Sequence, residues 1–164
     1  MRMYEKPLKK RWEILEHTAD QYIRAYGRDL EEALINAGLA LFDTMTDIKT
    51  VNKIITPQEI EHFTMEEETL EGLLYAFIEE CLVKWELTNK LFSKIETVLV
   101  DRGSNPSKRT GKTDPKYWLS VSLYGETYNP EKHPSKVGVK AMTYCNMKID
   151  IKPNRVILEF VIDI

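Results

Sequence analysis

The chain has 164 residues, of which 43% are hydrophobic and 30% are charged, and its net charge at pH 7 is −3. These values are ordinary for a globular protein and predict one domain with a sizeable core. A weakly negative charge excludes a global basic field of the kind that attracts nucleic acid. Residues 1–11 form a polar leader with no apolar region after it, and no apolar run reaches membrane-spanning length. We therefore expect a cytoplasmic protein without membrane contact.

The N-terminal part of the chain predicts two strands followed by a helix. Residues 12–16 and 21–26 are patterned as strands. Asp29 is a candidate N-cap, and Glu32 three residues later completes a capping-box pattern. Apolar residues then recur at helical spacing on a broad stripe, which predicts a well-buried helix over residues 29–46.

The middle of the chain predicts short strands and a very regular helix. Residues 49–63 are polar and β-branched, so we expect two short strands joined near Pro57. Residues 69–87 match the i, i+3, i+4, i+7 apolar template throughout. Two apolar helices need a surface to pack on, and strand-like residues 93–102 and 116–126 contribute one.

Residues 102–115 are predicted as an exposed loop. They contain Gly111-Lys112-Thr113, which is similar to the end of a phosphate-binding loop. Pro106 stands where the first glycine is required, and a strand follows where a helix is required, so we exclude a phosphate-binding loop. The loop is locally basic, which is compatible with RNA contact, but a hairpin connection is the favoured interpretation.

The last part of the chain alternates with a period of two. Residues 137–151 are expected to form one continuous strand, and residues 156–164 form the last strand after a turn at Asn154. Lys140 falls in the middle of the first of these strands, on its polar face. Thr143 falls on the apolar face, where its hydroxyl needs a hydrogen-bond partner.

These elements predict an α+β fold in a single domain over residues 12–164. We expect a largely antiparallel sheet packed against the two amphipathic helices. Cys81 and Cys145 both fall on apolar faces, so buried thiols are expected. The apolar stripes are expected to be used fully by the core, leaving no exposed apolar patch. Two cysteines and three scattered histidines do not form a zinc cage.

Carboxylates near the two ends of the chain are candidate ligands. The connection Glu16-His17-Thr18-Ala19-Asp20 lacks Gly, Asn and Pro, although it joins two strands. Its acids could bind a cation, but from these residues alone a bend in which Asp20 accepts backbone N–H bonds is favoured. Asp163 adjoins the terminal carboxylate of Ile164, and carboxylates held close either raise a pKa or recruit a cation. Lys140 is either a solvated edge lysine or a cation held over an anionic site.

Separated motifs of this chain together resemble the archease family. They follow one order from residue 12 to the end of the chain, and they are specific jointly rather than singly. The similar segments are Glu16-His17-Thr18-Ala19-Asp20, Leu30-Glu31-Glu32-Ala33, Met45-Thr46-Asp47, residues 70–85, Gly125-Glu126, Lys132-His133-Pro134, Val139-Lys140-Ala141-Met142-Thr143-Tyr144 and Val161-Ile162-Asp163-Ile164.

The resemblance implies an accessory factor with no catalytic residues of its own. Its partner would be the RNA-splicing ligase that joins a 2′,3′-cyclic or 3′-phosphate end to a 5′-hydroxyl end in tRNA splicing. The factor would promote guanylylation of the ligase, allow it multiple turnovers and broaden its use of nucleotide triphosphates. GTP and RNA would be met through the ligase.

The resemblance also implies which residues act. It places a metal site on Asp20, Asp163 and the terminal carboxylate of Ile164, and an important lysine on Lys140. Such oxygen ligands suit Ca²⁺, Mg²⁺ or Mn²⁺ rather than zinc. Supporting roles are expected for further polar residues of the chain: His17, Asp47, Glu126, His133 and Thr143.

Two other functions are weighed against this one. A stand-alone metal-dependent phosphoesterase could use Asp20, Asp163 and His17, but the sequence shows no convincing nucleophile–base pair and no further histidine ligands. Such an enzyme would turn over model phosphoesters alone with Mn²⁺. A general chaperone or protein-binding module would need an exposed apolar patch, which dye binding would detect.

Overall fold

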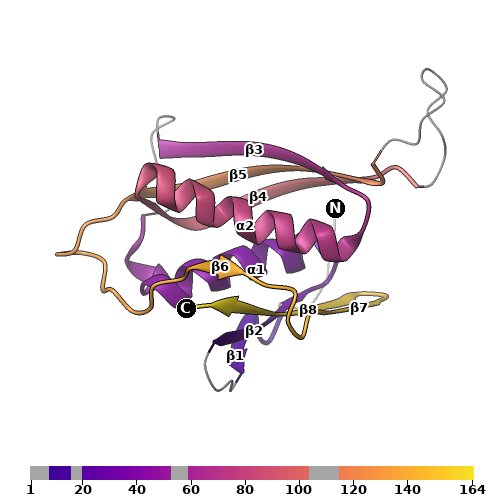
Figure 1. Cartoon of the computed structure of the whole chain (residues 1–164), viewed down its shortest axis with the longest axis horizontal. Helices are drawn as coiled ribbons and strands as arrows, with labels where there is room; N and C mark the ends of the chain where they lie inside the picture. Colours follow the sequence, from indigo (N-terminus) through magenta and orange to yellow (C-terminus); the bar gives the residue numbers. More distant parts are fainter. Residues whose placement is uncertain (1–7, 16–19, 53–58, 104–114) are drawn as a thin grey trace.

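The computed structural model describes residues 8–15, 20–52, 59–103 and 115–164. Within these ranges the chain forms two antiparallel β-sheets with two α-helices between them (Figure 1). The predicted α+β class is confirmed, but the single sheet that we expected is two separate sheets. Alternation of apolar residues shows that a strand buries one face, but it does not show which strand lies beside it.

The five-stranded sheet is built around strand β8 (Arg155–Asp163). One edge of β8 pairs with β2 (Gln21–Gly27), which pairs in turn with β1 (Trp12–Leu15). The other edge pairs with β7 (Lys148–Lys152) and then, near the end of β8, with β6 (Ala141–Met142). The predicted apolar face of β8 is buried against the helices, through Val156, Leu158, Phe160 and Ile162.

The three-stranded sheet has β5 (Tyr117–Thr127) between β3 (Ile60–Glu67) and β4 (Lys90–Asp101). The register of β4 shifts between Phe92 and Lys94, opposite Gly125. A Cβ atom at Gly125 would lie 1.7 Å from the carbonyl oxygen of Leu91. Glycine is therefore required at this bulge, one residue before Glu126.

Both helices begin at a side-chain cap, and in α1 it is the predicted one. In α1 (Leu30–Met45), the side chain of Asp29 accepts a 2.9 Å hydrogen bond from the backbone N–H of Glu32. The carboxylate of Glu32 accepts the backbone N–H of Arg28, one residue before the position that a standard capping box uses. In α2 (Leu70–Thr88), Thr69 caps the first turn, and Asn89 ends the helix in the left-handed conformation.

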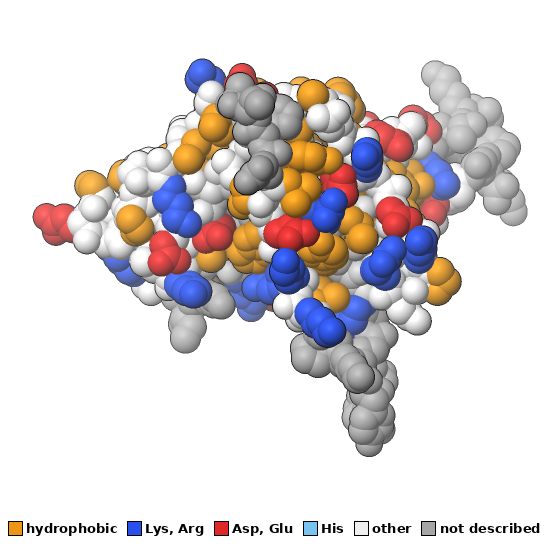
Figure 2. Space-filling model, turned by 90° about the horizontal axis from the view of Figure 1, so that it is seen from below, with side chains coloured by type: hydrophobic (Ala, Val, Ile, Leu, Met, Phe, Trp, Pro, Cys, Tyr) orange, Lys and Arg blue, Asp and Glu red, His pale blue; other side chains and the backbone are white. Residues whose placement is uncertain are grey.

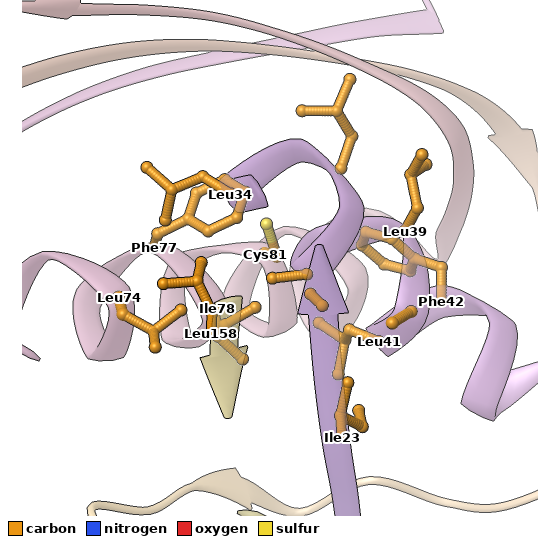
Figure 3. Close-up of a cluster of buried hydrophobic side chains, with 14 of the residues drawn as sticks. Ile23, Leu34, Leu39, Leu41, Phe42, Leu74, Phe77, Ile78, Cys81 and Leu158 are labelled. Carbon is orange, nitrogen blue, oxygen red and sulfur yellow. The ribbon is translucent and has the colours of Figure 1, made fainter. Parts of the chain in front are cut away.

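The core lies where the two helices meet the sheets. Side chains from α1, α2, β2 and β8 point toward one another, including Phe42, Phe77, Ile23 and Leu158 (Figure 3). α1 buries residues on nearly every side because it packs against β2 and β4 of opposite sheets. Each large apolar side chain in such a core contributes about 1.5–3 kcal/mol through removal from water.

The predicted continuous strand over residues 137–151 is wrong. Only Ala141–Met142 and Lys148–Lys152 are strands, and a turn with Asn146 at a φ of 52° separates them. Met142 is buried, on the face that we expected to be polar. Lys140 therefore precedes a two-residue strand instead of lying within a long one.

Other expectations need correction as well. Cys81 is buried as predicted, but Cys145 is exposed in the turn. Residues 48–50 form a 3₁₀-helix rather than a strand, while residues 53–58, with the junction predicted at Pro57, lie outside the described residues. Large apolar side chains also remain exposed, against our expectation of complete use by the core: Ile14, Leu87, Val98, Val100, Tyr144 and Ile151. In the described part of the chain, no helix is long and apolar enough to cross a membrane.

Candidate metal centre at the end of strand β8

The end of β8 brings together segments that are far apart in the sequence. Gln21 pairs with Ile162 across one edge of β8, and Ala141 pairs with Asp163 across the other. Extending this register by one residue places Asp20 opposite Asp163. Figure 1 shows the C-terminus next to β6. The sheet thus gathers the predicted acidic residues at one end.

Alternation decides which side of the sheet these carboxylates occupy. Ile162 is buried toward the helices, so Asp163 points to the outer side. Residues directly opposite each other in an antiparallel pair have Cβ atoms about 4.5–5.5 Å apart and share a face. Asp20 and Asp163, both half-buried, therefore point to the same side.

Lys140 lies at the same end of the sheet, directly before β6. Its backbone N–H donates a 2.8 Å hydrogen bond to the carbonyl oxygen of Asp163. Its side chain is exposed, and a lysine carries its charge on a long flexible stem.

Thr143 holds the turn after β6 to the central strand. Its hydroxyl donates a 2.8 Å hydrogen bond to the carbonyl oxygen of Val161 and accepts the backbone N–H of Cys145 at 3.2 Å. The predicted need for a hydroxyl partner is thereby met. Thr143 acts as a positioning residue for the segment that carries Lys140.

His133 and Glu126 anchor the segment that leads to Lys140. The Nδ1 atom of His133 accepts the backbone N–H of Asn129, so Nε2 faces Glu126 Oε1 at 2.8 Å as a donor. The same carboxylate accepts bonds from Lys132 and from the backbone N–H of Asn52. Burial opposes ionisation of Glu126, but these hydrogen bonds outweigh it and lower its pKa. His133 is itself buried, which favours loop anchoring over chemistry.

Two of the predicted supporting residues remain, Asp47 and His17. Asp47 caps the 3₁₀-helix, because its carboxylate accepts the backbone N–H of Lys49 at 3.1 Å. His17 lies outside the described residues.

Lys136 is a positioning residue that sequence reasoning missed. Its backbone N–H and its Nζ atom donate 3.0 Å hydrogen bonds to the carbonyl oxygens of Met45 and Asp43 at the end of α1. A single lysine among Pro, Ser and Gly gave no signal of this role.

A polar network on the outer face of the sheet was also missed. The carboxylate of Glu159 accepts bonds from Tyr22 and Arg24, and Arg24 bridges to Glu13. Figure 2 shows this face, with acidic and basic side chains interspersed. A hydrogen bond from Tyr26, followed by one from Lys10, lowers the pKa of Glu13 to about 2. The network fixes β1, β2 and β8 on the side toward which Asp20 and Asp163 point.

Comparison with known proteins gives the relationship directly. Residues 12–164 match the model of the Archease protein family (MTH1598/TM1083). The chain belongs to the archease family. The archease of Thermococcus kodakarensis is 40% identical over 156 residues, which cover 94% of this chain and 99% of that protein. The archease of Sulfolobus acidocaldarius is 43% identical over 154 residues, with the same coverage.

Solved structures agree with this archease fold. The solution structure of Methanobacterium thermoautotrophicum protein 1598 superimposes with a TM-score of 0.75 at 28% identity, covering 94% of this chain and 99% of that one. A crystal structure from Thermotoga maritima, described as an archease and possible chaperone, has a TM-score of 0.56 at 14% identity over the full length of both chains. The second likeness shows the fold alone.

The carboxylates of Asp20 and Asp163 supply oxygen donors, the ligand type that hard divalent cations prefer. Within the described residues, no three side chains of His, Cys, Asp and Glu gather as metal ligands. The predicted set needs only two such side chains, Asp20 and Asp163, because its third ligand is the main-chain carboxylate of Ile164. Three carboxylates brought together repel one another, and a cation relieves that repulsion.

Proposed function

We propose that this archease is a non-catalytic activator of the RNA-splicing ligase that joins a 3′-phosphate end to a 5′-hydroxyl end. It would promote guanylylation of the ligase in the cytoplasm, allow multiple turnovers and broaden the nucleotide triphosphates that the ligase accepts. Membership of the family supports the accessory role. The observation that carries the proposal is the register of β8, which directs Asp20 and Asp163 to one end of the sheet.

The carboxylates would hold a divalent cation, Ca²⁺, Mg²⁺ or Mn²⁺. When bound, such an ion neutralises phosphate charge during guanylyl transfer. The ligands would be Asp20, Asp163 and the terminal carboxylate of Ile164. Their position at a sheet end allows the cluster to approach a site on another protein, whereas a cluster inside a pocket would serve a small substrate of its own.

Lys140 would act on the same site from the opposite edge of β8. Its backbone bond to Asp163 ties its position to that of the carboxylates. The exposed ammonium group can offset excess negative charge or contact a phosphate of the nucleotide. GTP and RNA would be contacted while they are bound to the ligase.

A multiple-turnover assay tests this function. The ligase, GTP, Mn²⁺ and an excess of 3′-phosphate RNA are mixed with and without the protein. We expect the wild type to convert a single round into many rounds. Asp20→Ala and Asp163→Ala should lose at least tenfold of this activation, as should a chain extended by two residues beyond Ile164.

The matched control is Asp150→Ala. Asp150 is an exposed aspartate in β7, on the same sheet but paired with Arg155, away from the cluster. It should retain activation.

Calorimetric titration of the protein alone with Mn²⁺ gives a readout independent of the ligase, and Asp20→Ala should abolish that binding. Full activation by all three site variants would refute the proposed site, and no activation by the wild type would refute the function.

A further inference from the structure

An exposed tyrosine in the turn after β6 has no part in the candidate metal centre. Tyr144, in the turn after β6, stacks on Tyr75 of α2, with ring centroids 4.2 Å apart and ring planes at 10°. Tyr144 is nevertheless 58% exposed, while Tyr75 is half-buried. We call this pair the tyrosine stack. Figure 1 shows β6 and the turn after it running along α2.

The turn around Tyr144 is held on several sides. Glu79 of α2 accepts the backbone N–H of Met142 at 3.3 Å, and the hydroxyl of Thr143 bonds to β8. The backbone N–H of Met147 donates to the carbonyl oxygen of Tyr144. A side chain that is already ordered loses little conformational entropy on binding, so the exposed ring is preorganised for a partner. Exposed tyrosines of this kind are common among the residues that dominate protein–protein binding.

The charge around the tyrosine stack selects the kind of partner. The face of α2 that carries Tyr75 is acidic, because Glu71 and Glu79 lie one helical turn on either side of it. The other charged residues of α2 and the turn before it are Glu68, Glu80, Glu86 and one basic residue, Lys84. Lys84 lies 3.8 Å from Glu80 and so neutralises one of these acids. This surface repels RNA phosphates and complements a basic protein surface.

We infer that the tyrosine stack is the anchor by which this protein docks on a basic surface of its partner protein. The inference rests on the proposed function, because it takes that partner to be the RNA ligase. An enzyme that binds RNA carries basic residues around its RNA site. The acidic surface around Tyr144 would meet those residues, while the aromatic ring enters a cleft of the ligase.

Docking and activation are separable in this structure. Tyr144 is three residues beyond Ala141, the residue that pairs with Asp163, and it stacks on α2, whereas Asp163 points to the outer side of the sheet. The anchor is therefore not one of the proposed metal ligands. Tyr144→Ala should weaken binding but leave the maximal activation intact once the protein is in excess. Asp20→Ala should do the opposite, with normal binding and no activation at any concentration.

Binding to immobilised ligase and activation over a concentration series test the inference. Tyr144→Ala should raise the Kd, and the concentration for half-maximal activation, by about tenfold or more, as at a binding hot spot. The matched control is Tyr124→Ala, because Tyr124 lies on the outer face of the three-stranded sheet, away from α2. It should change neither quantity. Wild-type affinity should also fall as salt concentration rises.

The outcomes are distinct. Normal affinity of a folded Tyr144→Ala variant overturns the docking inference while leaving the activator function standing. Loss of binding to a fluorescent 3′-phosphate RNA, with unchanged binding to the ligase, also overturns it, since Tyr144 would then be a base-stacking platform. If the wild type binds the ligase without activating it, the proposed function fails and the docking inference is still tested by the Kd values.

Discussion

The two helices and the segment 128–147 are held in place by different forces. α1 and α2 are fixed by burial of apolar side chains between two sheets. The segment 128–147 contains only the two-residue strand β6. This segment places Met142 in the core and packs a few more side chains against it, and polar bonds made by His133, Lys136 and Thr143 complete its anchoring. The core therefore fixes the helices, while the part that carries Lys140 and Tyr144 depends more on a small number of side-chain hydrogen bonds.

This difference has a consequence for where variation is tolerated. Core packing is spread over many contacts, so one conservative substitution changes the free energy of unfolding without redirecting the chain. The hydrogen bonds of His133 are buried, so their loss leaves buried polar groups unpaired. Substitutions in the segment 128–147 should thus alter its local order before they alter the fold.

The largest expected effect comes from breaking the helix core. Phe77→Ala removes a fully buried ring of α2, whose centroid lies 6.4 Å from the centroid of the Phe63 ring. We expect the free energy of unfolding in urea to fall by about 3–5 kcal/mol. Leu87→Ala is the control, because Leu87 belongs to the same helix but is 77% exposed. It should change stability by no more than about 0.5 kcal/mol. Equal losses of unfolding free energy in the two variants would contradict the conclusion that the buried side chains of α2 hold it in place.

The contrast between the helix core and the segment 128–147 also separates the features that could be predicted from the sequence from those that could not. The helix cap at Asp29 and the alternation of β8 follow local rules, and the structure confirms both predictions. The segment 137–151 obeys the same alternation but is broken by a threonine hydroxyl and by Asn146 in the left-handed conformation. The apolar periodicity of a sequence carries no information about these side-chain bonds. A long strand was therefore predicted where the structure has a turn.

The candidate site was predictable only in part. Asp20, Asp163 and Lys140 were selected through resemblance to a family, whereas their own neighbours in sequence favoured a bend and a solvated lysine. The juxtaposition of Asp20 and Asp163 depends on pairing of β2 with β8 between residues more than a hundred positions apart, and no local pattern encodes that pairing. The anchoring role of Lys136 was missed because its partners are carbonyl groups of a distant helix.

An intermediate effect is expected from His133→Ala. The change removes the partner of Glu126 and of the backbone N–H of Asn129 in a buried position. The free energy of unfolding should fall by about 1–3 kcal/mol. Hydrogen exchange should rise in residues 129–140 under conditions in which α1 and α2 stay protected, because the loss is local.

Lys132→Ala is the matched control for that experiment. Lys132 bonds to the same carboxylate of Glu126, but its side chain is 39% exposed. Water can replace this bond, so exchange in residues 129–140 should change little. If His133→Ala raised exchange uniformly across the molecule, the segment 128–147 would unfold together with the core, and the contrast between the two regions would not hold.

The smallest expected effect is on the pH dependence of unfolding in acid. It tests whether the packing of β1, β2 and β8 also depends on polar side chains. Folding lowers the pKa of Glu13 to about 2 from an ordinary value of 4.5, through hydrogen bonds from Tyr26, Lys10 and Arg24. Because the folded-state pKa is the lower one, this stabilisation is complete above pH 4.5 and is lost as the pH falls toward 2. Glu13 is partly exposed, so the contribution should be below about 1 kcal/mol. Glu13→Gln should flatten the pH dependence of unfolding in this window, and Tyr26→Phe should flatten it in part. If Glu13→Gln left the slope of unfolding free energy against pH unchanged, the polar network on the outer face would not stabilise β1, β2 and β8. These strands would then be stabilised by apolar burial alone.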